Sequence, residues 1–320
     1  MTTPELVRFE EVTKTYRTAR GRRLSALDRF SMTIPQGRTV GLLGPNGSGK
    51  TTALKALLGL VRPDSGTIHA FGHLLPHDQR HVAAHMGALI EGPAFTPSLT
   101  GRHNLRLTAQ LLGAPTRAVD EALELVDLEA AADRRYAGYS LGMKQRLGVA
   151  AAFLGRPDLL VLDEPMNGLD PEAVRDMRLL FGRLREDFGM TMVVSSHILA
   201  EVEQVSDRVA IVRDGRCIAD ADLTDLLAAG GPRLVLRVDD PDNARAALLG
   251  HGHHTTARTG PRGTELRLDE TAHGPDILKI LTSQGIYPHE MTQESPDLED
   301  VYVAAIRAAT TADPQNGEQT

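Results

Sequence analysis

Hydrophobic positions along the chain follow two periodicities, one typical of strands and one typical of helices. Apolar and polar residues alternate over 30–34, which predicts a strand with one buried face. The runs at 39–43 and 159–162 are continuously apolar, as in strands buried on both faces. Between 98 and 150 the apolar residues recur at helical spacing. We therefore expect an α/β fold.

The same patterns divide the chain into two domains. Residues 208–219 predict a hairpin, and the Pro- and Gly-containing residues 229–232 predict a linker. We expect a first domain over 5–228, with a helical subdomain at about 92–155.

The second part of the chain has its own order of elements. The patterns predict a strand, a helix, two strands, a helix, a strand over 286–291 and a final helix over 297–309. This βαββαβ order favours a small α+β ferredoxin-like domain at 232–309. The polar residues 310–320 predict a disordered tail.

The amino-acid composition mainly excludes certain classes of protein. Hydrophobic residues make up 41% of the chain and glycines number 30, which excludes a disordered protein. No apolar run approaches the roughly 18 residues that cross a bilayer, and the first residues do not resemble a secretory signal. The single cysteine, Cys217, cannot form an internal disulfide. We expect a cytoplasmic location.

The net charge of −7 is concentrated near the C-terminus and argues against a nucleic-acid partner. Residues 1–220 carry 27 basic and 26 acidic side chains, whereas 221–320 carry 8 and 16. Only five of the basic residues are lysines, and one of them, Lys50, stands in a glycine-rich segment.

This segment has the phosphate-binding P-loop (Walker A) pattern Gly-x-x-x-x-Gly-Lys-Thr between an apolar run and a helical pattern. Glycines let backbone N–H groups converge on phosphates, Lys50 reaches the terminal phosphates, and the Thr51 hydroxyl is a Mg²⁺ ligand. An ordinary glycine-rich turn is the alternative, but it does not require the Lys-Thr pair. The predicted nucleotide site consists of Gly44, Pro45, Asn46, Gly47, Ser48, Gly49, Lys50, Thr51 and Thr52.

A pair of carboxylates ends the apolar run at 159–162. Asp163 is a candidate Mg²⁺ ligand, and Glu164 is a candidate general base that orients and deprotonates water. The alternative is a pair of surface acids that closes a strand. Surface strands alternate, however, and this one does not.

Upstream, the segment Tyr139-Ser-Leu-Gly-Met143 precedes a helical pattern. Here the chain resembles the ATP-binding cassette (ABC) family, whose signature peptide is Leu-Ser-Gly-Gly-Gln. Ser140 and Gly142 match this peptide, whereas Tyr139, Leu141 and Met143 depart from it. A plain helix N-cap at Ser140 is the alternative. The position of the segment, about 20 residues before the carboxylate strand, favours the signature.

The resemblance implies roles for four further residues. Asp170 lies in a segment that resembles the D-loop, and His197 occupies the place of the switch histidine that contacts the γ-phosphate. Tyr16 occupies the place of the aromatic residue that stacks on adenine, although a surface tyrosine is the alternative. Glu91 stands where the family has a glutamine that ligates Mg²⁺ and senses the membrane partner, and a carboxylate is a competent ligand.

The resemblance covers residues 5–220, with six segments in the family's order. It implies a β-subdomain, a RecA-like core and a helical subdomain. The segments Ile90-Glu-Gly-Pro93, 139–143 and 295–302 resemble those of ATPase subunits of bacitracin-type antibiotic and lantibiotic exporters.

The resemblance also implies ATP and Mg²⁺ as cofactors and a homodimer in which Ser140 and Gly142 of one chain cap the nucleotide held by the other. ATP hydrolysis would power efflux of an antibiotic, lantibiotic or other hydrophobic compound. The pore would lie in separate integral-membrane permease subunits, with this chain peripheral on the cytoplasmic face of the membrane.

Two other functions compete with the exporter ATPase, and the sequence argues against each. Non-transport regulatory cassette proteins commonly carry two cassettes, whereas this chain has one P-loop. Repair ATPases of related fold need a long coiled coil between the P-loop and the signature, where only about 90 residues lie.

Overall fold

The computed structural model describes residues 4–17, 21, 23–229, 233–260, 263–268, 273–294 and 297–312. The chain forms two compact units: the second spans Thr224–Ala308, and the first comprises the residues up to Leu223 together with those from Ala309 onward. The divide thus lies at the start of helix α8 (Leu223–Ala229), a few residues before the expected domain end at 228. Ala229 of the expected linker ends this helix, and residues 230–232 lie outside the described residues. No helix in the described part of the chain is both long and apolar enough to span a membrane.

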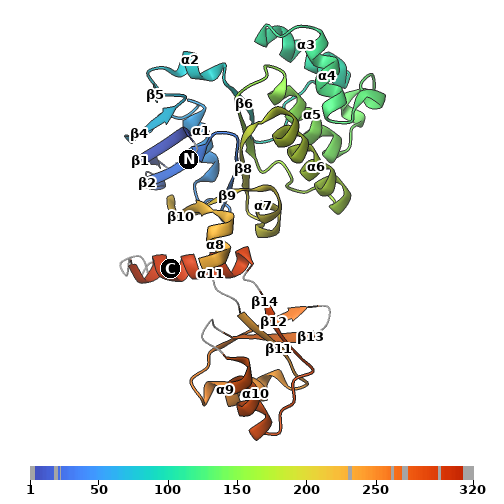
Figure 1. Cartoon of the computed structure of the whole chain (residues 1–320). Coiled ribbons are helices and arrows are strands. Elements are labelled where there is room, and N and C mark those ends of the chain that lie inside the picture. The colour runs from blue at the N-terminus through green and yellow to red at the C-terminus, as the bar shows by residue number, and fades with distance from the viewer. Residues whose placement is uncertain are drawn as a thin grey trace. The chain divides into compact units, whose positions relative to one another are not determined.

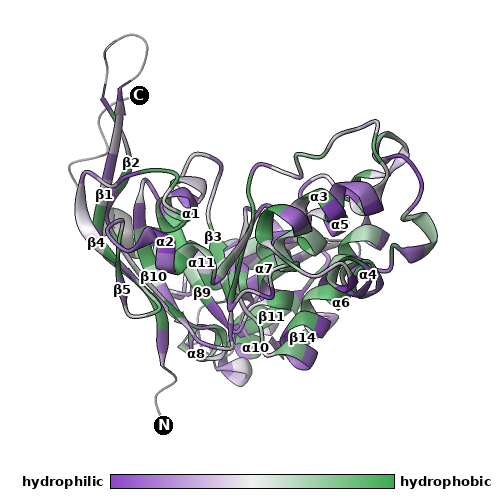
Figure 2. Ribbon diagram, turned by 90° about the horizontal axis from the view of Figure 1, so that it is seen from above, coloured by the Kyte–Doolittle hydropathy of each residue, from purple (hydrophilic) through white to green (hydrophobic). Residues whose placement is uncertain are grey.

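A six-stranded sheet forms the centre of the first unit. Its order is β10 (Arg216–Asp222), β9 (Arg208–Arg213), β3 (Thr39–Leu43), β8 (Thr191–Ser196), β7 (Leu159–Asp163) and β6 (Met86–Leu89). All neighbours pair in parallel except β10, which is antiparallel to β9. Every residue of β3, β7 and β8 is buried, which explains the continuous apolar runs in the sequence. Figure 2 shows this hydrophobic character along β3.

A second, antiparallel sheet lies on one side of the central sheet together with two helices (Figure 1). Its order is β2 (Arg23–Pro35), β1 (Glu5–Arg17), β4 (Ser65–Ala70) and β5 (His73–Leu75), and the helices are α1 (Lys50–Leu57) and α2 (Gln79–Ala83). Phe9 and Phe30 pack edge to face between β1 and β2, with ring centroids 5.5 Å apart. This sheet and α1 share one hydrophobic core with β3.

The remaining helices of the first unit lie on the other side of the central sheet (Figure 1). They are α3 (Gly101–Leu112), α4 (Arg117–Leu125), α5 (Leu141–Phe153), α6 (Pro171–Phe188) and α7 (Leu199–Val205). Two short 3₁₀ turns at Glu129–Ala131 and Tyr136–Gly138 connect α4 to α5. Helices α3 to α6 bury a second core, so the helices predicted within 98–150 are confirmed.

The predicted hairpin at 208–219 is confirmed as β9 and β10, and an ion cluster holds its base. Asp214 and Gly215 both have positive φ at the turn. Arg38 Nη1 lies 2.8 Å from one oxygen of Asp222, and Arg208 Nη1 lies 3.1 Å from the other. The hydrogen bond from Arg38, supported by Arg208, lowers the pKa of Asp222 below its ordinary value. The charged carboxylate therefore stabilises the fold.

We expect Asp222→Asn to lower the free energy of unfolding by about 1 kcal/mol at pH 7 and by progressively less as the pH falls toward 3. A lowered folded-state pKa gives stability that is present above the unfolded-state pKa of about 3.9 and is lost as the pH falls through the folded value. Urea unfolding of wild type and variant from pH 7 to pH 3 measures the difference. Asp214→Asn, at a site 78% exposed where asparagine also tolerates positive φ, is the control and should cost little at any pH. A pH-independent effect of Asp222→Asn would contradict this account.

The second unit contains a four-stranded antiparallel sheet in the order β12-β13-β11-β14. Its elements are β11 (Arg233–Arg237), α9 (Pro241–Leu249), β12 (Thr255–Gly260), β13 (Gly263–Leu268), α10 (Gly274–Ser283), β14 (Glu290–Glu294) and α11 (Leu298–Ala312). Leu236 and Leu266 of the sheet share a core with Leu248 of α9 and Leu281 of α10. The elements from β11 to β14 follow the expected βαββαβ order, and every described strand pair among them is antiparallel.

Two boundaries in this unit were predicted wrongly. The strand expected over 286–291 is β14, which begins only at Glu290. Ile286 is buried in the core before the strand begins, where its N–H donates to the Leu281 carbonyl, and Pro288 has no N–H for a ladder. The tail was expected to be disordered from Thr310, but α11 continues to Ala312, and residues 313–320 lie outside the described residues.

Candidate functional site

The carboxyl ends of three neighbouring strands bring the predicted phosphate and catalytic residues together. β8 lies between β3 and β7, and all three are parallel, so the segments that follow them meet at one edge of the sheet. The P-loop follows β3, Asp163 ends β7 with Glu164 directly after it, and His197 follows β8.

Lys50 is the buried cation of this site, with only 4% of its surface exposed. Its Nζ donates to the Gly44 carbonyl at 2.7 Å and to the Pro45 carbonyl at 3.3 Å, and lies 3.2 Å from Glu164 Oε1. The loop around it requires glycine: Gly49 has φ 113°, and a Cβ on Gly44 would lie 2.3 Å from the Val212 carbonyl oxygen. The chain thus wraps closely around the lysine.

The two carboxylates at the end of β7 have different partners. The Thr51 hydroxyl donates to Asp163 Oδ2 at 2.8 Å. Glu164 Oε2 lies 2.8 Å from His197 Nδ1, while its other oxygen faces Lys50. Glu164 has φ 49°, a left-handed conformation that is rare for a residue with a side chain. Its carboxylate is thereby held between a lysine and a histidine.

Sequence reasoning missed Ser195, which contacts both carboxylate residues. Its hydroxyl donates to Asp163 Oδ1 at 2.6 Å and accepts the Glu164 N–H at 2.9 Å. The neighbouring Ser196 donates instead to the buried Glu201 at 2.6 Å and accepts the Ile198 N–H. Two hydroxyls at the end of a wholly buried strand are the signal that could have identified these residues.

A cavity of about 330 Å³ opens beside the P-loop. Glu164, residues 46–52, the strand residues 24–26 and Tyr16 line it. Tyr16 is 38% exposed, and Lys14 Nζ lies 5.7 Å from the centre of its ring. The structure therefore places Tyr16 in the same cavity lining as the phosphate-binding segment.

The signature and D-loop residues form a separate group. Ser140 caps α5 by accepting the Met143 N–H, and Asp170 caps α6 by accepting the Ala173 N–H at 2.8 Å. A Cβ on Gly142 would lie 2.9 Å from the Ala173 Cβ, so these two helix starts are in contact. Among the described residues that line the P-loop cavity, none belongs to this group.

Tyr139 replaces the first residue of the signature and is anchored in the core. Its hydroxyl donates to the Ala131 carbonyl at 2.8 Å, and burial raises its pKa. A Cβ on Gly101 would lie 2.1 Å from the Tyr139 hydroxyl oxygen, so α3 begins with a glycine that leaves room for this ring. This departure from the signature thus has a packing role.

Glu91 lies outside the carboxylate cluster. Its Oε1 is 2.6 Å from Lys55 Nζ on α1, and its side chain is 68% exposed. It is absent from the described lining of the P-loop cavity.

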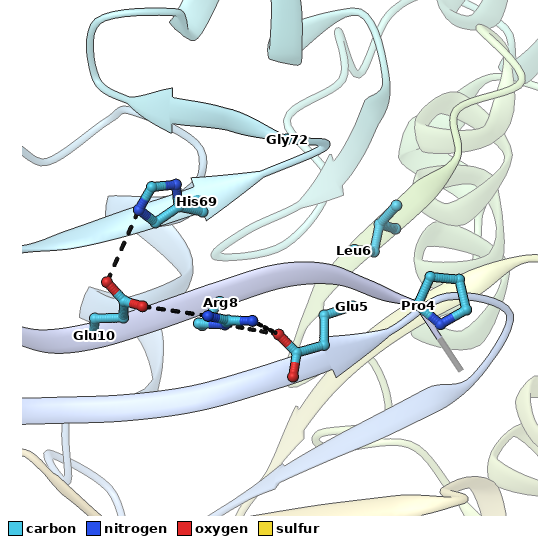
Figure 3. A pocket seen from close by; sticks show the side chains of 7 residues that line it. All are labelled: Pro4, Glu5, Leu6, Arg8, Glu10, His69 and Gly72. Atoms are coloured by element: carbon cyan, nitrogen blue, oxygen red, sulfur yellow. Dashed lines mark hydrogen bonds and ion pairs between the residues drawn. The ribbon is translucent and has the colours of Figure 1, made fainter. Parts of the chain in front are cut away.

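A second cavity, of about 630 Å³, lies against β1 and β4 and contains none of the predicted site residues (Figure 3). Arg8 pairs there with Glu5 and Glu10, and His69 Nε2 lies 3.9 Å from Glu10. None of the P-loop residues and neither of the carboxylates at the end of β7 is among its described lining residues, so we do not assign the nucleotide site to this surface.

The residues of the P-loop site fit a nucleotide with Mg²⁺. The Ser48 hydroxyl is buried and has no hydrogen-bond partner within the described part of the chain, and it lies in the loop expected to hold phosphate. The Thr51 hydroxyl and the Asp163 carboxylate are oxygen ligands of the kind that Mg²⁺ takes alongside substrate phosphates.

Comparison with known proteins tests the family assignment. The ABC transporter family model matches residues 27–167. The ABC transporter ATP-binding protein YcbN of Bacillus subtilis, which is uncharacterized, is 35% identical, covering 94% of this chain and 97% of that protein. The bacitracin transport ATP-binding protein BcrA of Bacillus licheniformis is 33% identical, covering 95% of this chain and 98% of that protein. A dimeric, post-hydrolysis structure of the ATP-binding cassette MJ0796 bound to ADP and Pi is 26% identical, with a TM-score of 0.60 over 68% of this chain and 98% of that one.

These similarities confirm both the predicted resemblance and the α/β cassette fold of the first unit. They extend over nearly the full length of relatives that are more than 30% identical, well beyond the P-loop itself. The chain belongs to the ABC transporter family of ATP-binding proteins.

Proposed function

We propose that this chain is the ATP-hydrolysing subunit of an exporter that drives an antibiotic, lantibiotic or other hydrophobic compound through a separate membrane permease. The observation that carries the hydrolytic role is Glu164, held between Lys50 and His197 beside the P-loop. Export is supported by the relatives: besides the bacitracin transport proteins, the Nod factor export ATP-binding protein I of Burkholderia lata is 38% identical over 71% of this chain. The regulatory alternative has no support among them.

The contacts of Glu164 support its role as the general base. Its carboxylate orients the attacking water and accepts a proton from it, and the hydrogen bond from His197 fixes the direction of the carboxylate. Lys50 places a positive charge on the phosphate side of the same carboxylate. Thr51 and Asp163 would hold Mg²⁺, which when bound supplies neutralisation of the phosphate charge. His197 and Tyr16 would contact the γ-phosphate and the adenine, respectively.

The separation of the signature group from the P-loop cavity supports a homodimer. Ser140, Gly142 and Asp170 cap or adjoin helix N-termini, which favour anions, yet they do not line the cavity of their own chain in the described structure. A second copy would bring its signature to the nucleotide. The dimeric structures of the MJ0796 cassette support the homodimer itself.

The proposal extends to the organisation of the chain. Residues 5–228 would be the ATPase domain, with a helical subdomain at about 92–155, and the 87–105 region would transmit its motion to the permease. Residues 232–309 would be an accessory domain. Glu91 would act at the nucleotide metal after leaving Lys55. The chain would lie on the cytoplasmic face of the membrane, held there by the permease.

Purification of the tagged chain from its native membranes tests this function. We expect Mg²⁺-dependent ATP hydrolysis, copurification of an integral-membrane protein, and stimulation of turnover of the complex by its transported compound. Hydrolysis by a chain that never copurifies with a membrane protein would favour the regulatory alternative. Absence of hydrolysis by both the chain and its complex would contradict the enzymatic role.

A further inference from the structure

Ser195 occupies the one position on β8 that faces Asp163 across the ladder to β7. The residue is fully buried, and its hydroxyl is used twice, as a donor to Asp163 Oδ1 and as an acceptor from the Glu164 N–H. The donor distance of 2.6 Å is typical of a strong bond from a hydroxyl to a carboxylate. One side chain therefore contacts two consecutive residues of the candidate site.

The first of these contacts restrains the Asp163 carboxylate. Ser195 holds Oδ1, and Thr51 holds Oδ2 at 2.8 Å, so both oxygens have a hydroxyl partner. The rotamer of Asp163 is then fixed from β8 as well as from the P-loop. Hydrogen bonds of this kind orient ligating carboxylates in metal sites.

The second contact restrains the Glu164 backbone. Glu164 adopts φ 49°, a conformation that persists only where its surroundings hold it. The Ser195 hydroxyl binds its N–H on one side, while Lys50 and His197 bind the carboxylate on the other. Removing the hydroxyl would leave a buried N–H and a carboxylate oxygen without this partner and free the residue to change conformation.

We propose that Ser195 is a positioning residue that sets the direction of the Glu164 carboxylate and the rotamer of Asp163 together. This inference rests on the proposed function of the site. Ser196 does not duplicate the role, since its hydroxyl is directed to Glu201 and the Ile198 N–H. Asp163 and Glu164 thus depend on the neighbouring strand β8 for their geometry.

The experiment compares Ser195→Ala, which removes the hydroxyl, with Ser195→Thr, which keeps it. The thermal unfolding temperature of each purified variant is measured first, to show that it is folded. Turnover and KM for ATP are then measured with the folded chains. We expect Ser195→Ala to lower kcat by about 10- to 100-fold with KM changed less than about threefold, and Ser195→Thr to recover most of kcat. Ser206→Ala is the matched control, because the Ser206 hydroxyl is buried without a hydrogen-bond partner among the described residues. It should retain wild-type turnover.

A second readout needs no hydrolysis. With a non-hydrolysable ATP analogue bound, Mn²⁺ affinity is measured by electron paramagnetic resonance, and Ser195→Ala should weaken it about three- to tenfold through release of Asp163. Turnover of the wild-type chain tests the proposed function, whereas the ratio of kcat between Ser195→Ala and Ser195→Thr tests the positioning role of Ser195. If wild type does not hydrolyse ATP, or if the threonine variant unfolds early, the Mn²⁺ titration of Ser195→Ala decides. Wild-type kcat or Mn²⁺ affinity in Ser195→Ala, or equal losses in well-folded alanine and threonine variants, would overturn the proposal.

Discussion

Replacing Glu164 with glutamine is expected to lower ATP turnover by about 10²- to 10⁴-fold while ATP binding persists. Glutamine has nearly the same shape and keeps a carbonyl oxygen that can accept from Lys50 or His197, but it cannot take a proton from water. Nucleotide binding by isothermal titration calorimetry and phosphate release measure the two properties separately. Glu124→Gln makes the same change on the exposed face of α4 and should leave both unchanged.

The binding and turnover results together identify the role of the carboxylate. Retained ATP binding with lost turnover indicates an interaction that is needed for the chemical step. Unchanged turnover in Glu164→Gln would remove the general-base assignment, and loss of both properties would assign the residue to nucleotide binding. The Glu164→Gln chain should also accumulate as a dimer with ATP, which gel filtration can detect.

The main parts of the site were predictable because each consists of consecutive residues next to a recognisable element. The P-loop needs glycines and the Lys50-Thr51 pair in one segment, and Asp163 and Glu164 directly follow a buried run. The parallel order of β3, β8 and β7 then brings their ends together. The local sequence thus identifies the residues of each motif, and the order of the strands in the sheet brings the motifs together.

Contacts between side chains of different strands were not predictable in this way. The role of Ser195 depends on its position opposite Asp163 in the ladder between β7 and β8. No local sequence pattern predicts this register. The ion pair of Glu91 with Lys55 likewise depends on where a loop lies against α1. In the second unit, Ile286 packs into the core before β14 begins. Its apolar side chain was therefore mistaken for the first residue of the strand pattern.

Neither Lys50→Ala nor Ser140→Arg chains are expected to hydrolyse ATP alone, yet an equal mixture should recover about a quarter of wild-type turnover. Lys50→Ala removes the buried cation beside Glu164, and Ser140→Arg places a bulky charge at the start of α5. Each single change should cost at least about 10²-fold.

The recovery follows from the geometry of the proposed dimer. If the chains pair at random, about half of the dimers contain one chain of each kind, and in these one of the two composite sites has both Lys50 and Ser140 intact. A mixture of Lys50→Ala with Glu164→Gln is the control, because Lys50 and Glu164 lie in the same chain's site, 3.2 Å apart, and every mixed site then carries a defect. Two different affinity tags isolate the mixed dimers, in which phosphate release should reach about half of the wild-type rate because one of the two sites is intact. No recovery in verified Lys50→Ala and Ser140→Arg dimers, or equal recovery in the control mixture, would show that the signature group does not act on the partner's nucleotide.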